Sequence, residues 1–204
     1  MLVVGLTGSI GMGKSTAAAR FRARGISVFD ADAEVHRLYA GPLNEEIERA
    51  FPGSVVGGIV DRGKLAEQLL ANPHRFKDLE AIVHPRVHQA ERNFLQEQKS
   101  HGPSMAVLEI PLFFEGGRDE HVDAIVVVTA SPEVQRERVL ARSGMTDAKF
   151  EAVVARQLPE VEKLERADFV VDTNGSVENC NSQIDRIITK LLPLSATAYD
   201  KYWR

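Results

Sequence analysis

The sequence predicts an α/β protein built on a five-stranded parallel sheet flanked by helices, and three observations favour this fold class. Five short apolar runs rich in β-branched residues alternate with longer segments of helical pattern. Strands joined through helices form βαβ units, whose right-handed crossovers produce a parallel sheet. The run at 124–128 is apolar throughout, as expected for a parallel strand buried on both faces.

The strands and helices are expected in alternation along the chain. The expected strands are 2–7, 26–29, 105–110, 124–128 and 168–171. Helices are expected over about 14–24, where Gly25 ends the helix, and over about 176–192. Ser131 followed by Pro132 is typical of the cap and first position of a further helix.

Two segments are longer than a crossover requires, and both are expected to be helical insertions into a single unit, 1–204. The expected core comprises about 1–30, 102–130 and 167–193. A substrate-binding insertion is expected over about 31–101, with glycine and proline turns that include Gly57-Gly58, and a lid over about 131–165. Both leave the sheet after the carboxyl end of a strand, the edge where open α/β sheets bind ligands, so they are placed to cover one.

The composition excludes several classes of protein. The 204 residues include 25 Lys and Arg against 29 Asp and Glu, a net charge of −4, which argues against a nucleic-acid partner. No apolar run approaches the ~18 residues that a bilayer span needs. The single cysteine, Cys180, can form neither an intrachain disulfide nor a Cys-based zinc site. We therefore expect a cytoplasmic protein without a membrane partner, as a monomer or weak homo-oligomer.

The segment Gly8–Ser15 carries the clearest chemical signal. It has the P-loop pattern of glycine, four residues and Gly-Lys-Ser, and it lies between an expected strand and an expected helix. Glycines allow successive backbone N–H groups to converge on phosphate oxygens, and the helix adds the positive end of its dipole. We expect Lys14 to reach the β- and γ-phosphates of a nucleotide and Ser15 to offer its hydroxyl to Mg²⁺.

Two carboxylates, Asp30 and Asp32, follow the second expected strand. Asp30 could hold Mg²⁺ through water, while Asp32 could accept a proton from a substrate hydroxyl. Phosphoryl transfer needs both a metal that neutralises the phosphate oxygens and a carboxylate that orients the nucleophile. The alternative is that one of them only caps the next helix. The residues alone leave both interpretations open.

Three arginines lie close together near the start of the expected lid. Arg138 and Arg142 are four residues apart and share a helical face, while Arg136 points elsewhere. A lid arginine can close on a γ-phosphate and spread its developing charge. The alternative is a solvated helix in which Glu133 and Glu137 accompany the arginines.

His84 and His88 are four residues apart, but they do not form the zinc site of a metalloprotease. The zinc-protease pattern requires glutamate directly after the first histidine, and the chain has Pro85 there. We expect Pro85 to occupy the first position of a helix.

With these features in view, the sequence resembles the dephospho-CoA kinase family over nearly its whole length. The resemblance is carried by Leu6–Thr16, Gly25–Asp32, Asp61-Arg62 with Leu65, His84-Pro85, Pro111–Glu115, Ser131-Pro132 with Gln135 and Arg138, Gln157, Ala167-Asp168 and Asn174-Gly175. The family more often has glycine at position 9 and serine at position 12. It often has arginine at position 153, where this chain has valine, and Arg156 is the nearby candidate to replace it.

The resemblance implies a P-loop kinase core of the nucleoside-monophosphate-kinase type, with a substrate domain and a lid. It implies that ATP phosphorylates the ribose 3′-hydroxyl of dephospho-CoA in the last step of CoA biosynthesis, with Mg²⁺. The implied catalytic residues are Asp32, Lys14 and Arg138. The implied ATP-binding residues are Gly8, Ile10, Gly11, Met12, Gly13, Lys14, Ser15, Thr16, Arg142 and Asn174. The implied substrate-binding residues are Asp32, His84, Pro111 and Leu112, and the implied metal ligands are Ser15 and Asp30.

Two alternatives to this function remain open at the level of the sequence. One is another small-molecule or nucleotide kinase of the same architecture. The other is a P-loop regulatory module that binds GTP. The chain lacks the guanine-reading Asn-Lys-x-Asp pattern, and its only Asp-x-x-Gly, at 172–175, follows the fifth expected strand, which is late for a switch segment.

Overall fold

The computed structural model describes every residue from Met1 to Arg204, and the chain divides into two compact units. The first unit comprises Met1–Phe29 and Leu95–Arg204, and the second comprises Asp30–Phe94. The second unit covers most of the segment expected as the first insertion, whereas residues 95–101 belong to the first unit. No helix is both long enough and apolar enough to cross a membrane.

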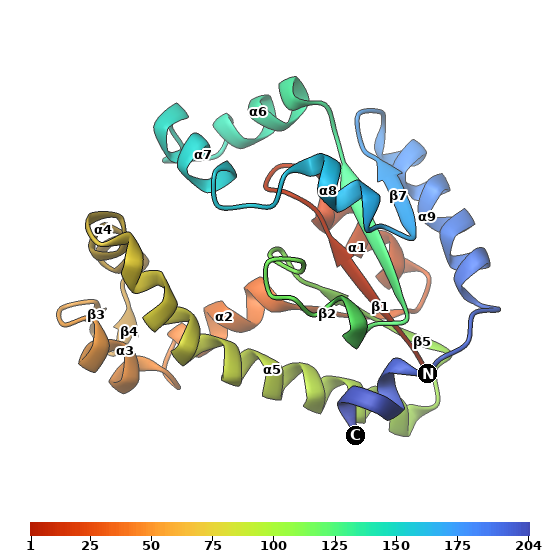
Figure 1. Ribbon diagram of the computed structural model, residues 1–204, viewed down its shortest axis with the longest axis horizontal. Helices are drawn as coiled ribbons and strands as arrows, with labels where there is room; N and C mark the ends of the chain where they lie inside the picture. Colours follow the sequence, from red (N-terminus) through yellow and green to blue (C-terminus); the bar gives the residue numbers. More distant parts are fainter. The chain divides into compact units, whose positions relative to one another are not determined.

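A five-stranded parallel sheet forms the centre of the first unit (Figure 1). Its strands are β1 (Leu2–Thr7), β2 (Ser27–Asp30), β5 (Met105–Glu109), β6 (Ala124–Thr129) and β7 (Phe169–Asp172). The strand order is β2-β5-β1-β6-β7, and β1 pairs in parallel with both β5 and β6. All five predicted strands are confirmed, each within one residue of the predicted ends, because buried β-branched runs leave little ambiguity about their extent.

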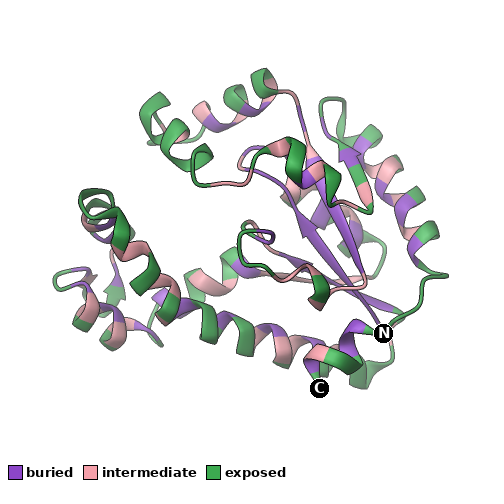
Figure 2. Cartoon of the chain, viewed as in Figure 1, coloured by how far each residue is buried: buried purple, intermediate pink, exposed green.

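The two faces of this sheet bury different sets of side chains. Leu2, Val4 and Leu6 of β1 lie on the face that packs against α1 (Lys14–Ala23) and α9 (Val177–Leu191). On the other face, Phe113 and Phe114 join Ile125 and Val127 of β6 in a smaller cluster. The three central strands, β5, β1 and β6, are consequently almost entirely buried, whereas the edge strands β2 and β7 are partly exposed (Figure 2). A rigid sheet of this kind holds the loops at its carboxyl edge in fixed positions.

An ion-pair cluster joins α1 to α9 on the outside of the core. Arg20 contacts both carboxylate oxygens of Asp185 at 2.8 and 2.5 Å, and Arg24 donates to Oδ1 at 2.8 Å. Hydrogen bonds from Arg20, then from Arg24, hold the pKa of Asp185 well below its usual range. The helix that follows the glycine-rich loop is therefore tied to the last helix of the chain.

The C-terminal tail, whose structure the sequence left uncertain, closes against the loop before β6. Tyr199–Trp203 forms one π-helical turn, and the indole of Trp203 donates to the carbonyl of His121 at 2.7 Å. Asp123 accepts hydrogen bonds from the backbone of Val3 and Ala198, both at 2.8 Å. These contacts bind the tail to the beginning of β1.

The segment expected as a helical lid contains three short helices. They are α6 (Pro132–Leu140), α7 (Asp147–Val154) and α8 (Glu160–Glu165). The hydroxyl of Ser131 accepts from the backbone N–H of Val134, and Pro132 begins α6, as predicted. α7 has no buried residue, whereas α8 buries Lys163 completely. The end of this segment is therefore packed far more firmly than its middle.

The second unit is mainly helical. Its helices are α2 (Ala31–Tyr39), α3 (Asn44–Ala50), α4 (Arg62–Ala71) and a short 3₁₀ turn at Pro73–Arg75, followed by α5 (Phe76–His101), which continues into the first unit. Its buried apolar side chains come from several of these elements, among them Leu38, Ile47, Phe51, Leu65 and Leu69.

Two sequence predictions for the second unit are wrong. The expected all-helical segment contains an antiparallel hairpin, β3 (Val55–Val56) and β4 (Ile59–Val60). Gly57 and Gly58 join its strands with φ of +59° and +78°, a two-residue turn that requires positive φ at both positions. The β-branched residues beside this turn favour strands, a signal too short to be conspicuous in the sequence.

Pro85 does not begin a helix but lies inside α5, which has 26 residues. The helix continues through it because Val83 and Val87, four residues apart, are both buried on one helical face. Tertiary burial therefore outweighs the hydrogen bond that proline cannot donate.

We predict that Asp185→Asn lowers the melting temperature at pH 7 by a few degrees, because Arg20 and Arg24 lose their carboxylate partner. A depressed pKa contributes stability that is complete above the unfolded value of about 3.9 and is lost as the pH falls toward the folded value. The difference in melting temperature between the parent and the variant should therefore become smaller as the pH is lowered from about 5 toward 2. The matched control is Asp200→Asn in an exposed pair, and a difference independent of pH would contradict this account.

Candidate functional site

The glycine-rich loop between β1 and α1 lies so close to its neighbours that two of its positions cannot carry a side chain. A Cβ added to Gly8 would lie 2.5 Å from the carbonyl oxygen of Val128, and one added to Gly11 would lie 2.5 Å from Val139 Cγ2. Gly11 and Gly13 also have φ of +79° and +87°, which only glycine adopts readily. The local sequence therefore permits the sharp turn that aims the N-terminus of α1 outward.

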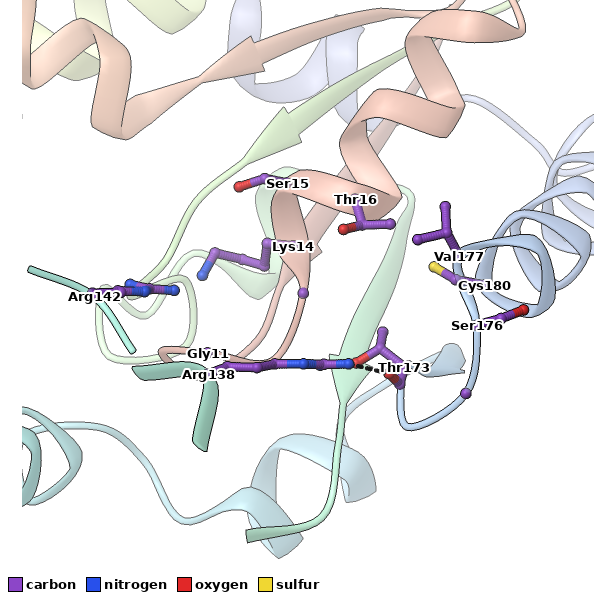
Figure 3. Close-up of a pocket in the computed structure, with 12 residues that line it drawn as sticks. Gly11, Lys14, Ser15, Thr16, Arg138, Arg142, Thr173, Ser176, Val177 and Cys180 are labelled. Carbon is purple, nitrogen blue, oxygen red and sulfur yellow. Dashed lines mark hydrogen bonds between the residues drawn. The ribbon is translucent and has the colours of Figure 1, made fainter. Parts of the chain in front are cut away.

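A cavity of about 410 Å³ opens at this N-terminus (Figure 3). It is lined by Gly11, Gly13, Lys14, Ser15, Thr16, Arg138, Arg142, Thr173, Gly175, Ser176, Val177 and Cys180. Three of these side chains are cationic and none is acidic. Together with the helix N-terminus, this composition suits an anionic ligand such as a nucleotide phosphate.

Lys14 and Ser15 stand at the start of α1, as the motif predicts. The Lys14 ammonium donates to the carbonyl of Gly8 at 3.0 Å, within its own loop, and Ser15 is exposed at the cavity. The chain contains no group of three or more His, Cys, Asp or Glu side chains that could hold a metal ion. Mg²⁺ takes oxygen ligands and keeps several of its waters, and the Ser15 hydroxyl is an oxygen at this cavity that could hold it.

The expected helical face shared by Arg138 and Arg142 is not found, because α6 ends at Leu140 and Arg142 lies beyond it. Arg138 and Arg142 both line the cavity, while Arg136 pairs with Asp147 of α7. The Arg138 guanidinium donates to the hydroxyl of Thr173 at 3.0 Å and to its carbonyl at 2.6 Å. Arg138 is thus held at the cavity wall by the end of β7.

Sequence reasoning missed the wall of the cavity formed between β7 and α9. This wall is lined by Thr173, Gly175, Ser176, Val177 and Cys180. In this region the sequence had predicted only the neighbouring Asn174 as an ATP contact. The available signal was Ser176, which caps α9 by accepting from the N–H of Asn179. Burial raises the pKa of the Cys180 thiol.

Several residues expected to bind ATP or substrate lie nearby but do not line the cavity. The Met12 sulfur accepts from the N–H of Ala130 at 3.0 Å, within the core. Asn174 instead accepts from the N–H of Ser131 at 2.7 Å. Gly8, Ile10, Pro111 and Leu112 are likewise absent from the lining. Their proposed ligand contacts stay predictions.

In the second unit, the two carboxylates of the Asp-Ala-Asp segment have different environments. Asp30 caps α2, its Oδ1 accepting from the N–H of Ala33 at 2.9 Å, which is the alternative that the sequence left open. Asp32 is exposed and lines a cavity of about 340 Å³. The other lining residues are Val35, His36, Tyr39, Arg62, Leu65, Ala66, Leu69 and Leu79.

This second cavity combines an apolar wall with a few polar groups. Arg62 lies 2.7 Å from His36 Nε2, and burial raises the pKa of the Tyr39 hydroxyl, with Arg62 opposing the rise. Such a cavity can accept a ligand that has both apolar and anionic parts. His84 does not line it and stacks instead on His88, with ring centroids 6.0 Å apart.

Comparison with known proteins gives a consistent result. The sequence model of the dephospho-CoA kinase family matches residues 2–179. A dephospho-CoA kinase of Rhodopseudomonas palustris strain HaA2 is 52% identical over 188 residues, which cover 92% of this chain and 94% of the relative.

Solved structures agree with this. The Thermus thermophilus protein TT1252 superposes with a TM-score of 0.79 at 39% identity, covering 93% of this chain and 97% of that one. The dephospho-CoA kinase of Campylobacter jejuni does so with a TM-score of 0.68 at 26% identity, covering 93% and 96%. The parallel sheet, the glycine-rich loop with its cationic cavity and these matches together show that the chain belongs to the dephospho-CoA kinase family.

Proposed function

We propose that this chain transfers the γ-phosphoryl group of ATP to the ribose 3′-hydroxyl of dephospho-CoA, with the first unit holding the nucleotide and the second holding the acceptor. Membership of the family supports ATP as donor and dephospho-CoA as acceptor. The observation that carries the assignment of roles is the P-loop cavity, which gathers a helix N-terminus and three cationic side chains without an acidic one.

The nucleotide phosphates are the natural occupants of that cavity. Backbone N–H groups of the loop and the start of α1 donate to the β- and γ-phosphates, and the Lys14 ammonium exchanges the Gly8 carbonyl for a phosphate oxygen. Arg138 and Arg142 face the same space and can spread the negative charge of the transferring group.

Mg²⁺ is the cofactor that this site fits. When bound, it would supply positive charge that neutralises part of the charge of the phosphates. The Ser15 hydroxyl is the protein group placed to hold it, with Asp30 proposed to act through water. Asp30 would serve this role while it caps α2 through Oδ1.

Asp32 is proposed to orient the acceptor hydroxyl. It lines a cavity whose leucines suit the apolar parts of the acceptor and whose Arg62 suits an anionic part. Because the transition state of phosphoryl transfer is loose in most analyses, the carboxylate contributes more by orienting the hydroxyl than by removing its proton early. His84, Pro111 and Leu112 remain proposed acceptor contacts without support from the lining of this cavity.

In-line transfer requires the hydroxyl held by Asp32 to meet the γ-phosphate held by Lys14. Such a meeting places the attacking oxygen, the phosphorus and the leaving oxygen roughly in line.

The direct test uses purified protein with ATP, Mg²⁺ and dephospho-CoA, and follows CoA by chromatography. We expect CoA and ADP in equal amounts, with little product when EDTA removes the metal. A panel of nucleoside monophosphates and shikimate-like alcohols tests the alternative kinase activities, and GTP in place of ATP tests the regulatory module. Preferential phosphorylation of another acceptor would overturn the proposed substrate.

We predict that Asp32→Asn lowers kcat by about 10²–10⁴-fold, the range that a positioned acid–base group contributes, with a small change in the KM for ATP. The matched control is Asp78→Asn, an exposed aspartate of the same unit outside the cavity, which should retain parental turnover. Circular dichroism confirms that both variants fold. Near-normal turnover by folded Asp32→Asn would disprove the role.

Replacing the lid arginines should distinguish those at the cavity from the one outside it. We predict that Arg138→Gln lowers kcat by about 10²-fold or more, because the transferring phosphoryl loses a charge partner. Arg136→Gln, which removes only a pair with Asp147, should lower it less than threefold or so. Equal losses in steady-state CoA formation would contradict the assignment of Arg138.

A further inference from the structure

A charged cluster lies beside the first turn of the glycine-rich loop, and none of its members lines the nucleotide cavity. We call it the Ser9 cluster, and it consists of Ser9, Glu115, Glu160 and Lys163. Lys163 is the only lysine whose side chain is fully buried. Its ammonium donates to the Ser9 hydroxyl at 2.8 Å, and that hydroxyl donates to Glu160 Oε2 at 3.0 Å.

The cluster brings together three segments that are distant in the sequence. Ser9 belongs to the loop after β1, Glu115 follows β5, and Glu160 and Lys163 lie on α8. The Lys163 ammonium is 3.6 Å from Glu115 Oε1, and the same oxygen accepts from the N–H of Leu158 at 2.6 Å. The loop is therefore tied to both of the other segments through a single buried cation.

A buried ammonium is stable only when it is paired and hydrogen-bonded, so the position of Lys163 is strongly determined by its partners. One oxygen, Glu160 Oε1, is buried without a hydrogen-bond partner. Burying that oxygen costs free energy, and packed apolar side chains would hold α8 in place without this cost. The buried charges of the Ser9 cluster therefore suggest that they fix the positions of particular atoms, rather than only adding to the stability of the fold.

The next residue of the loop is also held from outside the cavity. The N–H of Ile10 donates to Gln157 Oε1 at 3.1 Å, and its carbonyl accepts from Gln135 Nε2 at 2.8 Å. Gln135 lies at the beginning of the lid segment and Gln157 near its end. Two consecutive loop residues are thus fixed by side chains, immediately before the N–H groups that face the cavity.

We propose that Lys163, acting through Ser9, is a positioning residue for ATP: it fixes the first turn of the loop so that the N–H groups of 11–15 are already aimed at the phosphates. This inference rests on the proposed binding of ATP at the loop. Preorganised donors stabilise charge without reorganising during the reaction, and a displacement of about 1 Å can cost about 10²-fold in rate.

The experiment compares Ser9→Ala, Lys163→Met, Lys163→Arg and the double variant Ser9→Ala/Lys163→Met. For each variant, calorimetry measures ATP affinity, and steady-state assays measure kcat and the KM of both substrates. We expect kcat/KM for ATP to fall about tenfold in Ser9→Ala and up to about 10²-fold in Lys163→Met. The KM for dephospho-CoA should stay within about twofold of the parent, and Lys163→Arg should recover part of the loss.

The double variant tests whether Lys163 acts through Ser9. If it does, adding Ser9→Ala to Lys163→Met causes no further loss, whereas additive losses would refute the coupling. Lys190→Met is the matched control, because Lys190 is exposed on α9 and lies outside the Ser9 cluster and the nucleotide cavity, and it should behave as the parent.

A purely structural role gives a different pattern. It would lower the melting temperature and weaken the use of both substrates equally, and that result would overturn the proposal, as would unchanged ATP kinetics in Ser9→Ala. If Lys163→Met does not fold, Ser9→Ala and Lys163→Arg still decide the question. If the parent forms no CoA, the proposed function fails, whereas ATP affinity measured by calorimetry still tests the role of Lys163.

Discussion

The close approach of the loop after β1 to the strand and helix beside it is the constraint on which the candidate site depends. At Gly8 and Gly11 there is no room for even a Cβ, because Val128 and Val139 occupy the space. This contact fixes the turn against β6 and α6, so that α1 begins with its free N–H groups directed into the cavity. A bulkier loop would separate β1 from β6 or turn the helix away from its ligand.

Charge is divided between the framework and the site. Outside the cavity, cations pair with carboxylates: Arg20 and Arg24 with Asp185, and Lys163 with Glu115 of the Ser9 cluster. At the cavity, the lining includes cationic side chains and no acid, and Arg138 is held there by the neutral groups of Thr173. A field of one sign in a concave site favours a polyanion, although the protein as a whole carries a net charge of −4. Net charge therefore says little about the ligand of a local site.

The second unit shows how one short segment can serve two purposes. Asp30 ends β2 and caps α2, which fixes where the helix starts. Asp32 is then the second residue of that helix and lines the unit's cavity. A carboxylate in the first turn also interacts favourably with the helix dipole, so Asp32 stays compatible with the helix that carries it.

The fold could be predicted because its signals are local. Strands β1, β5 and β6 are mainly apolar runs. The loop Gly8–Ser15 has the spacing of glycine, lysine and serine that is typical of phosphate-binding loops. The β3–β4 hairpin was missed because four strand residues carry little signal, and Pro85 was misplaced because burial of α5 overrides a local preference. Five of the twelve residues that line the nucleotide cavity were also missed, since residues such as Thr173 and Cys180 reach it only through the packing of β7 and α9.

The sequence by itself determined the parallel sheet, the phosphate-binding loop and the resemblance to a kinase family. Each of these depends on residues that are close together in the chain. Only the tertiary structure decided that Asp30 is engaged as a cap, that the β7–α9 junction completes the cavity, and that Lys163 lies buried against Ser9. These facts concern residues whose environment is set by burial and by partners up to 154 positions away, and no local pattern encodes that environment.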